Sequence, residues 1–242
     1  KAGEYRKWYG NRDYVVNWQN DGYEMQTTLY PDGSRIWAHN FNLDYNFKEH
    51  ITWNDITTGK ISFRYFEDGF LFDAAAAVAF VNKNEKYKIL GYLNSNFVNS
   101  LTKLLNPTIH FKLGDYDNLP YDDWNEQSIS EISKKNIELC KKDWDSFETS
   151  WDFKRHPLIS VISHNRAFVD DTIDIDLAEC YTCWENECNE RFNQLKANEE
   201  ELNRIFIDIY GLQDELSPEV EDKDVTVRKA DLQRDIKSLI SY

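Results

Sequence analysis

The chain has 242 residues and a mass of 28.7 kDa, with 28 Lys and Arg against 43 Asp and Glu, a formal charge of −15 and a pI near 4.8. Taken over the whole chain, this balance argues against a protein that wraps nucleic acid, because phosphate binding depends on Lys and Arg. Hydrophobic residues make up 41% and aromatic residues 15%. That is enough apolar surface for a folded core, and it excludes a disordered acidic tail.

The sequence offers no membrane span, since its longest apolar stretch, Phe70 to Val81, is interrupted by Asp73 and is too short. The first residue is Lys rather than Met, so we expect the sequence to begin inside a longer polypeptide. Its 4 cysteines are too few and too unevenly placed for a disulfide scaffold, which fits a reducing cytoplasm. We therefore predict a soluble cytoplasmic protein.

The charge is divided unequally along the chain. Residues 1–121 carry 13 basic and 14 acidic residues, whereas residues 122–242 carry 15 and 29, so the net charges are −1 and −14. The first half also holds 24 of the 36 aromatic residues. Such asymmetry predicts two domains, 1–121 and 122–242.

The first half is predicted to be α+β. From Tyr5 to Phe72, aromatic and β-branched runs alternate with turn pairs such as Pro31-Asp32-Gly33 and Asp68-Gly69, a pattern typical of hairpins. Residues 86–105 have helical periodicity and end at Asn106-Pro107. A short strand is expected over 108–113.

The second half is predicted to be helical. One apolar stripe runs from Ile137 through Trp144 to Trp151, and a second runs from Leu177 to Ile209 with a polar Glu199 on it. Two such stripes predict an antiparallel, coiled-coil-like helix pair, with Gly211 as a C-cap. We expect residues 214–224 to form a solvated acidic loop and a last helix to follow.

Motifs of catalysis are absent from the sequence. It has no Gly-x-Gly spacing, no Gly-x-Ser-x-Gly and no His-Glu-x-x-His. Cys180, Cys183 and Cys188 have a suggestive metal spacing, but no fourth ligand lies nearby, so we predict no metal site. No catalytic residue can be assigned.

Short motifs in both halves nevertheless resemble one family. In order along the first half they are Lys7-Trp8-Tyr9-Gly10-Asn11, Tyr14-Val15-Val16-Asn17-Trp18, Ile51-Thr52-Trp53, Gly69-Phe70-Leu71-Phe72-Asp73, Leu90-Gly91-Tyr92-Leu93-Asn94-Ser95 and Leu105-Asn106-Pro107-Thr108-Ile109. In the second half they are Asp143-Trp144-Asp145-Ser146-Phe147-Glu148-Thr149-Ser150-Trp151-Asp152-Phe153, Asn198-Glu199-Glu200-Glu201-Leu202-Asn203 and Leu216-Ser217-Pro218-Glu219-Val220. The sequence resembles the large adenine-specific DNA methyltransferases of type IIG restriction-modification and, more specifically, those of the BREX phage-defence system (PglX-type).

The resemblance implies that the chain is the C-terminal target-recognition and spacer region of such an enzyme. In that family the S-adenosylmethionine fold and the catalytic Asn-Pro-Pro-aromatic element lie upstream, so this fragment should hold no cofactor and be inactive alone. Its implied partner is double-stranded DNA, reached through the parent enzyme. The helices would act as a spacer.

Recognition would place side chains on base edges, with Arg suited to guanine and Asn or Gln to adenine. The candidate DNA-binding residues of the first half are Arg12, Gln26, Arg35, Lys48, Asn54, Lys60, Arg64 and Lys112. Trp8, Trp18 and Trp53 are expected in the core.

Two other interpretations remain open. The acidic helices could dock other defence-system proteins, which would make the chain a protein-interaction module. A self-contained nuclease or other hydrolase would need clustered acids beside a Lys, and no motif supports one.

Overall fold

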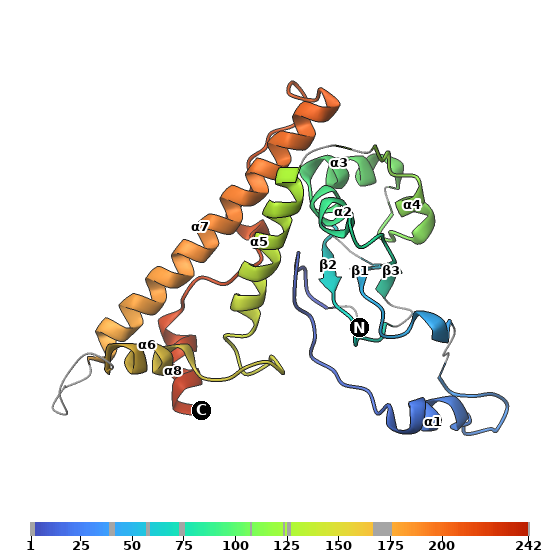
Figure 1. Ribbon diagram of the computed structural model, residues 1–242, viewed down its shortest axis with the longest axis horizontal. Coiled ribbons are helices and arrows are strands. Elements are labelled where there is room, and N and C mark those ends of the chain that lie inside the picture. The colour runs from blue at the N-terminus through green and yellow to red at the C-terminus, as the bar shows by residue number, and fades with distance from the viewer. Residues whose placement is uncertain are drawn as a thin grey trace.

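The computed structural model describes residues 3–38, 42–56, 59–72, 76–106, 108–122, 124, 127–166 and 176–241. The fold is α+β, as predicted: a small sheet and short helices lie beside two long helices (Figure 1). Within the described residues, no helix is long and apolar enough to cross a membrane.

The sheet has three antiparallel strands, β1 (His50–Asn54), β2 (Phe63–Phe66) and β3 (Ala76–Ala79), in the order β2-β1-β3. The N-terminal segment extends it, because Trp8 forms a parallel bridge to Arg64. Side chains alternate between the two faces of a strand. Ile51, Trp53 and Phe63 are therefore buried together on the face that forms the core.

One prediction about the early part of the first half is corrected. Residues 19–27, expected within hairpin-rich β-structure, form a helix, α1 (Gln19–Thr27), in which Asn20, Asp21 and Gly22 have positive φ angles. The Pro-Asp-Gly turn does make a small hairpin, with Leu29 bridged to Ile36. A short 3-10 turn, η1 (Leu43–Tyr45), follows.

The helix expected over 86–105 is two helices, α2 (Lys86–Leu93) and α3 (Asn96–Leu105). Ser95 interrupts the run, because its side chain accepts a hydrogen bond from the backbone N–H of Val98 and caps α3. Asn94, just before it, hydrogen-bonds both the N–H and the carbonyl of Phe63 at 3.0 Å. A tertiary contact with β2 thus accompanies the break.

The strand expected over 108–113 is also corrected. Among the described residues of that range, only His110 forms a bridge, to Ile56, and Leu113 already begins α4 (Leu113–Asp117).

The helical half contains α5 (Gln127–Trp144), α6 (Pro157–Arg166), α7 (Leu177–Tyr210) and α8 (Leu232–Ser241). α5 and α7 pack side by side and run in opposite directions, as predicted (Figure 1). α7 ends at Gly211, whose φ of 65° lies in the left-handed region that favours glycine at a helix C-terminus. The stripe expected to continue to Trp151 stops earlier, because α5 ends at Trp144.

The acidic residues 214–224 form a loop, as expected, and five of the six acids are exposed, but the return segment that contains them, residues 212–231, is not solvated throughout. Its Val220, Val225 and Val227 are buried in the main core, and a 3-10 turn, η2 (Asp222–Asp224), lies between them. The segment is also held by hydrogen bonds to its carbonyls, such as Asn203 to Pro218 at 2.9 Å. The acidic residues therefore lie on a return segment that is fixed to the rest of the molecule.

One hydrophobic core crosses the predicted boundary at residue 121. It joins Trp8, Trp53 and Leu90 of the first half to Leu195 and Phe206 of α7. Trp8 and Trp53 are fully buried, as predicted, whereas Trp18 is half-buried outside this cluster against Phe47. The division into two domains stays a prediction.

Glu199, the polar residue on the stripe of α7, is buried at this crossing. Its carboxylate pairs with the buried ammonium of Lys7 and accepts a 2.7 Å hydrogen bond from the indole N–H of Trp8. Burial opposes the charge on Lys7, yet the nearby Glu199 carboxylate raises the Lys7 pKa. The N-terminal segment that extends the sheet is therefore fixed to α7.

Gly91 marks the closest approach of α2 to α5. A Cβ atom added there would lie 2.5 Å from Ser133 Oγ and 2.9 Å from Ile129 Cγ2, and both neighbours are fully buried. Gly91→Ala should lower the free energy of unfolding by about 1–3 kcal/mol through overpacking. Gly114→Ala, a helical position with open space, is the control and should be neutral or slightly stabilising. Urea unfolding of both variants measures this, and equal stabilities would contradict the packing.

Glu199→Gln leaves the Lys7 ammonium buried without its counter-ion, so it should cost about 3–5 kcal/mol in the free energy of unfolding. Adding Lys7→Met to it should recover a large part of that loss, because no buried charge then remains unpaired. Glu201→Gln, on the exposed side of the same helix, should change stability by less than about 1 kcal/mol. Additive losses in the double variant would exclude direct coupling of Lys7 and Glu199.

Candidate nucleic-acid interface

The second face of the sheet carries polar side chains. Because residues alternate, His50, Thr52 and Asn54 of β1 share this face with Arg64 and Phe66 of β2, and we call these five residues the sheet-face cluster. Four of its members, all but Asn54, line a pocket together with Asn11, Arg12, Tyr14 and residues 70–72. The fold thus gathers several hydrogen-bond donors on this face of the sheet.

Arg64 is the most buried cation of this cluster, with 1% of its surface exposed. Its guanidinium donates to the Arg6 carbonyl at 3.1 Å, to Asn54 Oδ1 at 2.7 Å and, at 3.4 Å, to Ser62 Oγ. All three acceptors are neutral. Burial, together with the nearby charge of Arg6, lowers the Arg64 pKa to about 10, so the group stays charged at neutral pH.

Arg12 reaches the same face from the N-terminal segment but has a full set of partners. Its two terminal nitrogens each bind a different Glu67 oxygen at 2.6 Å, and the guanidinium lies 3.7 Å from the centre of the Tyr9 ring. Burial raises the Glu67 pKa, but the Arg12 hydrogen bonds outweigh it and hold that pKa below its usual value. Such a bidentate pair fixes Arg12 in place.

His50 lies beside these arginines with its ring stacked on Phe66 at 5.4 Å between centroids. Burial lowers the His50 pKa, so the ring is neutral at pH 7. Its Nδ1 is 2.8 Å from the Lys48 carbonyl, and since a carbonyl can only accept, Nδ1 carries the proton. Nε2 is then the acceptor nitrogen of this imidazole.

These groups surround a pocket of about 70 Å³, more than twice the roughly 30 Å³ that one water molecule takes up in the liquid. None of the described residues that line it is acidic. They are Asn11, Arg12, Tyr14, His50, Thr52, Arg64, Phe66, Phe70, Leu71, Phe72 and Ala76.

Three of the eight candidate DNA-binding residues, Arg12, Asn54 and Arg64, therefore lie together. Arg12 and Arg64 are buried, and their terminal nitrogens hold the fold together rather than facing solvent. Both polar atoms of the Asn54 side chain have partners: its oxygen accepts from Arg64, and its nitrogen donates to the Gly3 carbonyl at 2.8 Å. Arg12 and Arg64 can act on a ligand in the pocket, but not on a base in a groove at the surface.

The other five candidates are spread over the molecule. Lys60 pairs with Asp224 of the return segment at 2.7 Å. Lys112 is exposed at the start of α4, and Lys48 is exposed with its ammonium 5.0 Å from the Tyr45 ring centre. Gln26 and Arg35 lie on the arm described next.

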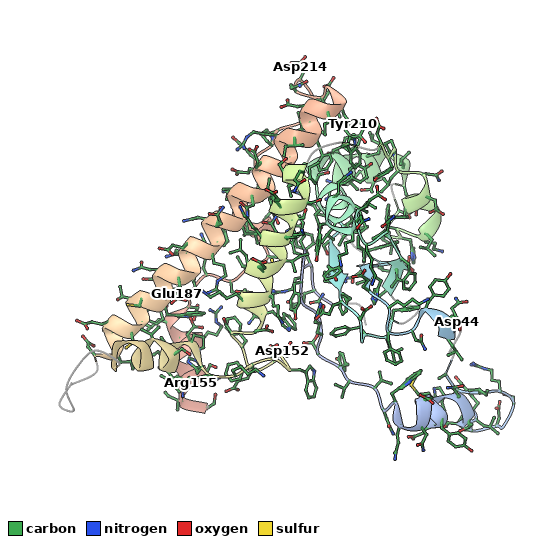
Figure 2. The ribbon with its side chains drawn as sticks, in the orientation of Figure 1. Asp44, Asp152, Arg155, Glu187, Tyr210 and Asp214 are labelled. Atoms are coloured by element: carbon green, nitrogen blue, oxygen red, sulfur yellow. The ribbon has the colours of Figure 1, made fainter. Side chains whose placement is uncertain are left out.

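The arm is residues 13–38, which leave the sheet as an extended chain, form α1 and return (Figure 1). Figure 2 shows its side chains standing out around α1. Tyr14, Val15, Tyr23 and Trp37 are each more than half exposed. Arg35 is the arm's single basic residue among four acids, and its guanidinium lies 4.3 Å over the Tyr30 ring.

Residue-type reasoning missed His50, Thr52 and the phenylalanines of the pocket. The signal was present in β1, where His50, Thr52 and Asn54 alternate with the core residues Ile51 and Trp53. That period of two places one polar set on one face.

No cluster of three or more metal-ligating side chains exists among the described residues. Cys180 and Cys188 are buried thiols on α7, and Cys183 is exposed.

Comparison with known proteins identifies relatives of the whole chain. No protein-family model matches it. A protein described as adenine-specific methyltransferase PglX, from Lacticaseibacillus casei (strain Zhang), is 46% identical over 244 residues, which covers 100% of this chain and 20% of that protein. The chain is homologous to one segment of the PglX-type adenine-specific methyltransferases. The resemblance to the BREX PglX-type proteins is thereby confirmed.

A second relative agrees with this assignment. Adenine-specific methyltransferase BrxX from Escherichia coli O9:H4 (strain HS) is 34% identical over 214 residues, 87% of this chain and 16% of that protein. The chain thus spans a fifth or less of the length of the PglX-type relatives it matches.

Proposed function

We propose that this chain is the DNA target-recognition part of a PglX-type adenine-specific methyltransferase. S-adenosylmethionine and the catalytic residues would then belong to the remainder of such an enzyme. The observation that carries the proposal is the match along the whole chain to a PglX-type methyltransferase, in a molecule whose nearly neutral first half presents the exposed cations Arg35, Lys48 and Lys112.

Surface contacts with DNA would come from the exposed cations of the first half. Arg35 and Lys48 each lie over an aromatic ring, Tyr30 and Tyr45, which restricts the rotamers of the cation before DNA arrives. Arg is the common reader of guanine, and Lys is suited to phosphate. Lys112 adds a third exposed cation on α4.

The outer side of α7 would stay away from DNA. Its exposed acids, Glu179, Glu185, Glu187, Glu190, Glu201 and Asp208, outnumber Arg204, the exposed cation of that helix. This strip of negative charge repels phosphates, so DNA would contact the first half instead.

The same acidic strip favours a second function, docking of a basic protein. Under this alternative, α7 would bind another component of the defence system, and the sheet would be scaffold. Capture of a basic partner by the chain, lost when Glu185, Glu187 and Glu190 are changed to Gln, would support it.

The DNA proposal is tested by selecting bound duplexes from a random library with the 242-residue chain at low salt. We expect one enriched motif, and we expect Arg35→Ala to relax one position in it at a cost of about 1–3 kcal/mol. Lys112→Ala should weaken all sequences alike and reduce the salt dependence.

Arg204→Ala, on the helical half, is the matched control and should change neither the motif nor the affinity. Binding without an enriched motif, or equal effects of Arg35→Ala and Arg204→Ala, would contradict the proposed recognition face.

A further inference from the structure

Arg64 is a buried cation without a buried anion. Its bonded acceptors are a carbonyl, an amide oxygen and a hydroxyl, and no described carboxylate lies within salt-bridge distance. The neighbouring Arg6 adds positive charge, and that charge is already matched by Asp143 at 3.2 Å. An unpaired buried charge is costly, and proteins that keep one commonly use it.

The donors left over in this region belong to the two arginines of one pocket. Nε of Arg64 and Nε of Arg12 are buried and have no hydrogen-bond partner among the described residues. Both arginines line the pocket of the sheet-face cluster, and the described lining residues include no acid. The terminal nitrogens of both arginines each make at least one hydrogen bond, so the two Nε atoms are the guanidinium nitrogens without a partner, and their N–H groups are available to a ligand.

The other lining groups suit an anion as well. Thr52 lies on the same face, and His50 is neutral, so it does not change the net charge of the pocket. Since Glu67 neutralises Arg12, the described residues leave the pocket one net positive charge, that of Arg64. A tetrahedral oxyanion can accept from two separate N–H donors through two of its oxygens.

We propose that this pocket binds a single phosphate group, held by Arg64 together with Arg12. Where the proposed function holds, the phosphate is one of the DNA backbone, and its contact with Arg64 fixes the register of the sheet on the duplex without reading sequence. This source of the phosphate rests on the proposed function, whereas the site itself does not.

The test is thermal unfolding of the 242-residue chain with inorganic phosphate titrated at constant ionic strength. We expect a saturable rise in Tm, which Arg204→Met retains. Arg64→Met should weaken phosphate binding about tenfold or more, because it removes a charge-assisted hydrogen bond. This variant should still fold, since replacing a buried ion by an apolar side chain is often tolerated.

Ala76→Leu provides a second variant, which narrows the pocket while leaving both arginines in place. In the unaltered chain, nuclear magnetic resonance gives an independent readout, because two of the arginine Nε–H signals should shift saturably with phosphate. No saturable response in the unaltered chain, or an equal response in Arg64→Met, overturns the site.

Measuring binding to duplex DNA distinguishes the phosphate site from the proposed function. If Arg64 contacts a backbone phosphate, Arg64→Met weakens duplex binding by the same factor for all sequences. If the chain binds phosphate but Arg64→Met does not change duplex affinity, the site is supported and the phosphate it binds is not one of the DNA backbone. Sequence-selective duplex binding without a phosphate response would overturn the site and leave the proposed function standing.

Discussion

The buried carboxylate of Glu199 joins the two halves of this molecule. It lies on α7, yet its partners, Lys7 and Trp8, come from the segment that extends the sheet. Trp8 in turn hydrogen-bonds along β2, with its N–H donating to the Phe63 carbonyl at 2.9 Å. One carboxylate thus links a 34-residue helix to the strand that presents Arg64. Because the pair is buried, loss of either partner would leave the other charge unpaired in the interior, which is strongly destabilising.

This link changes the meaning of the acidic character of the chain. Its charge of −15 comes almost wholly from the helical half, many of whose acids face outward on α7 or lie on the return segment, while others, such as Asp143, belong to α5. Some of these acids also fasten the halves together, as Asp224 does with Lys60 and Asp143 with Arg6. The acidic half therefore positions a nearly neutral sheet and keeps phosphates away from itself.

Local patterns in the sequence were sufficient for much of the fold. The stripe from Leu177 to Ile209 and the glycine after it predicted α7 and its end, since periodicity and capping depend on neighbours in sequence. The break at Asn94 could not be predicted, because Asn94 bonds Phe63, 31 residues away. For the site, residue types pointed to Arg12 and Arg64, but their burial depends on tertiary packing. Glu199 stood out on its stripe, and only the fold could supply Lys7, 192 residues away.

Native-state hydrogen exchange tests the coupling of the halves most directly. It would compare the amides of Trp8 and Tyr65, which bond across the sheet extension, with those of the buried middle of α7 around Leu202. If one core unites the halves, these amides exchange with the same opening free energy and lose protection together in rising denaturant. Two separate plateaus, with the sheet amides opening while α7 stays protected, would contradict the account.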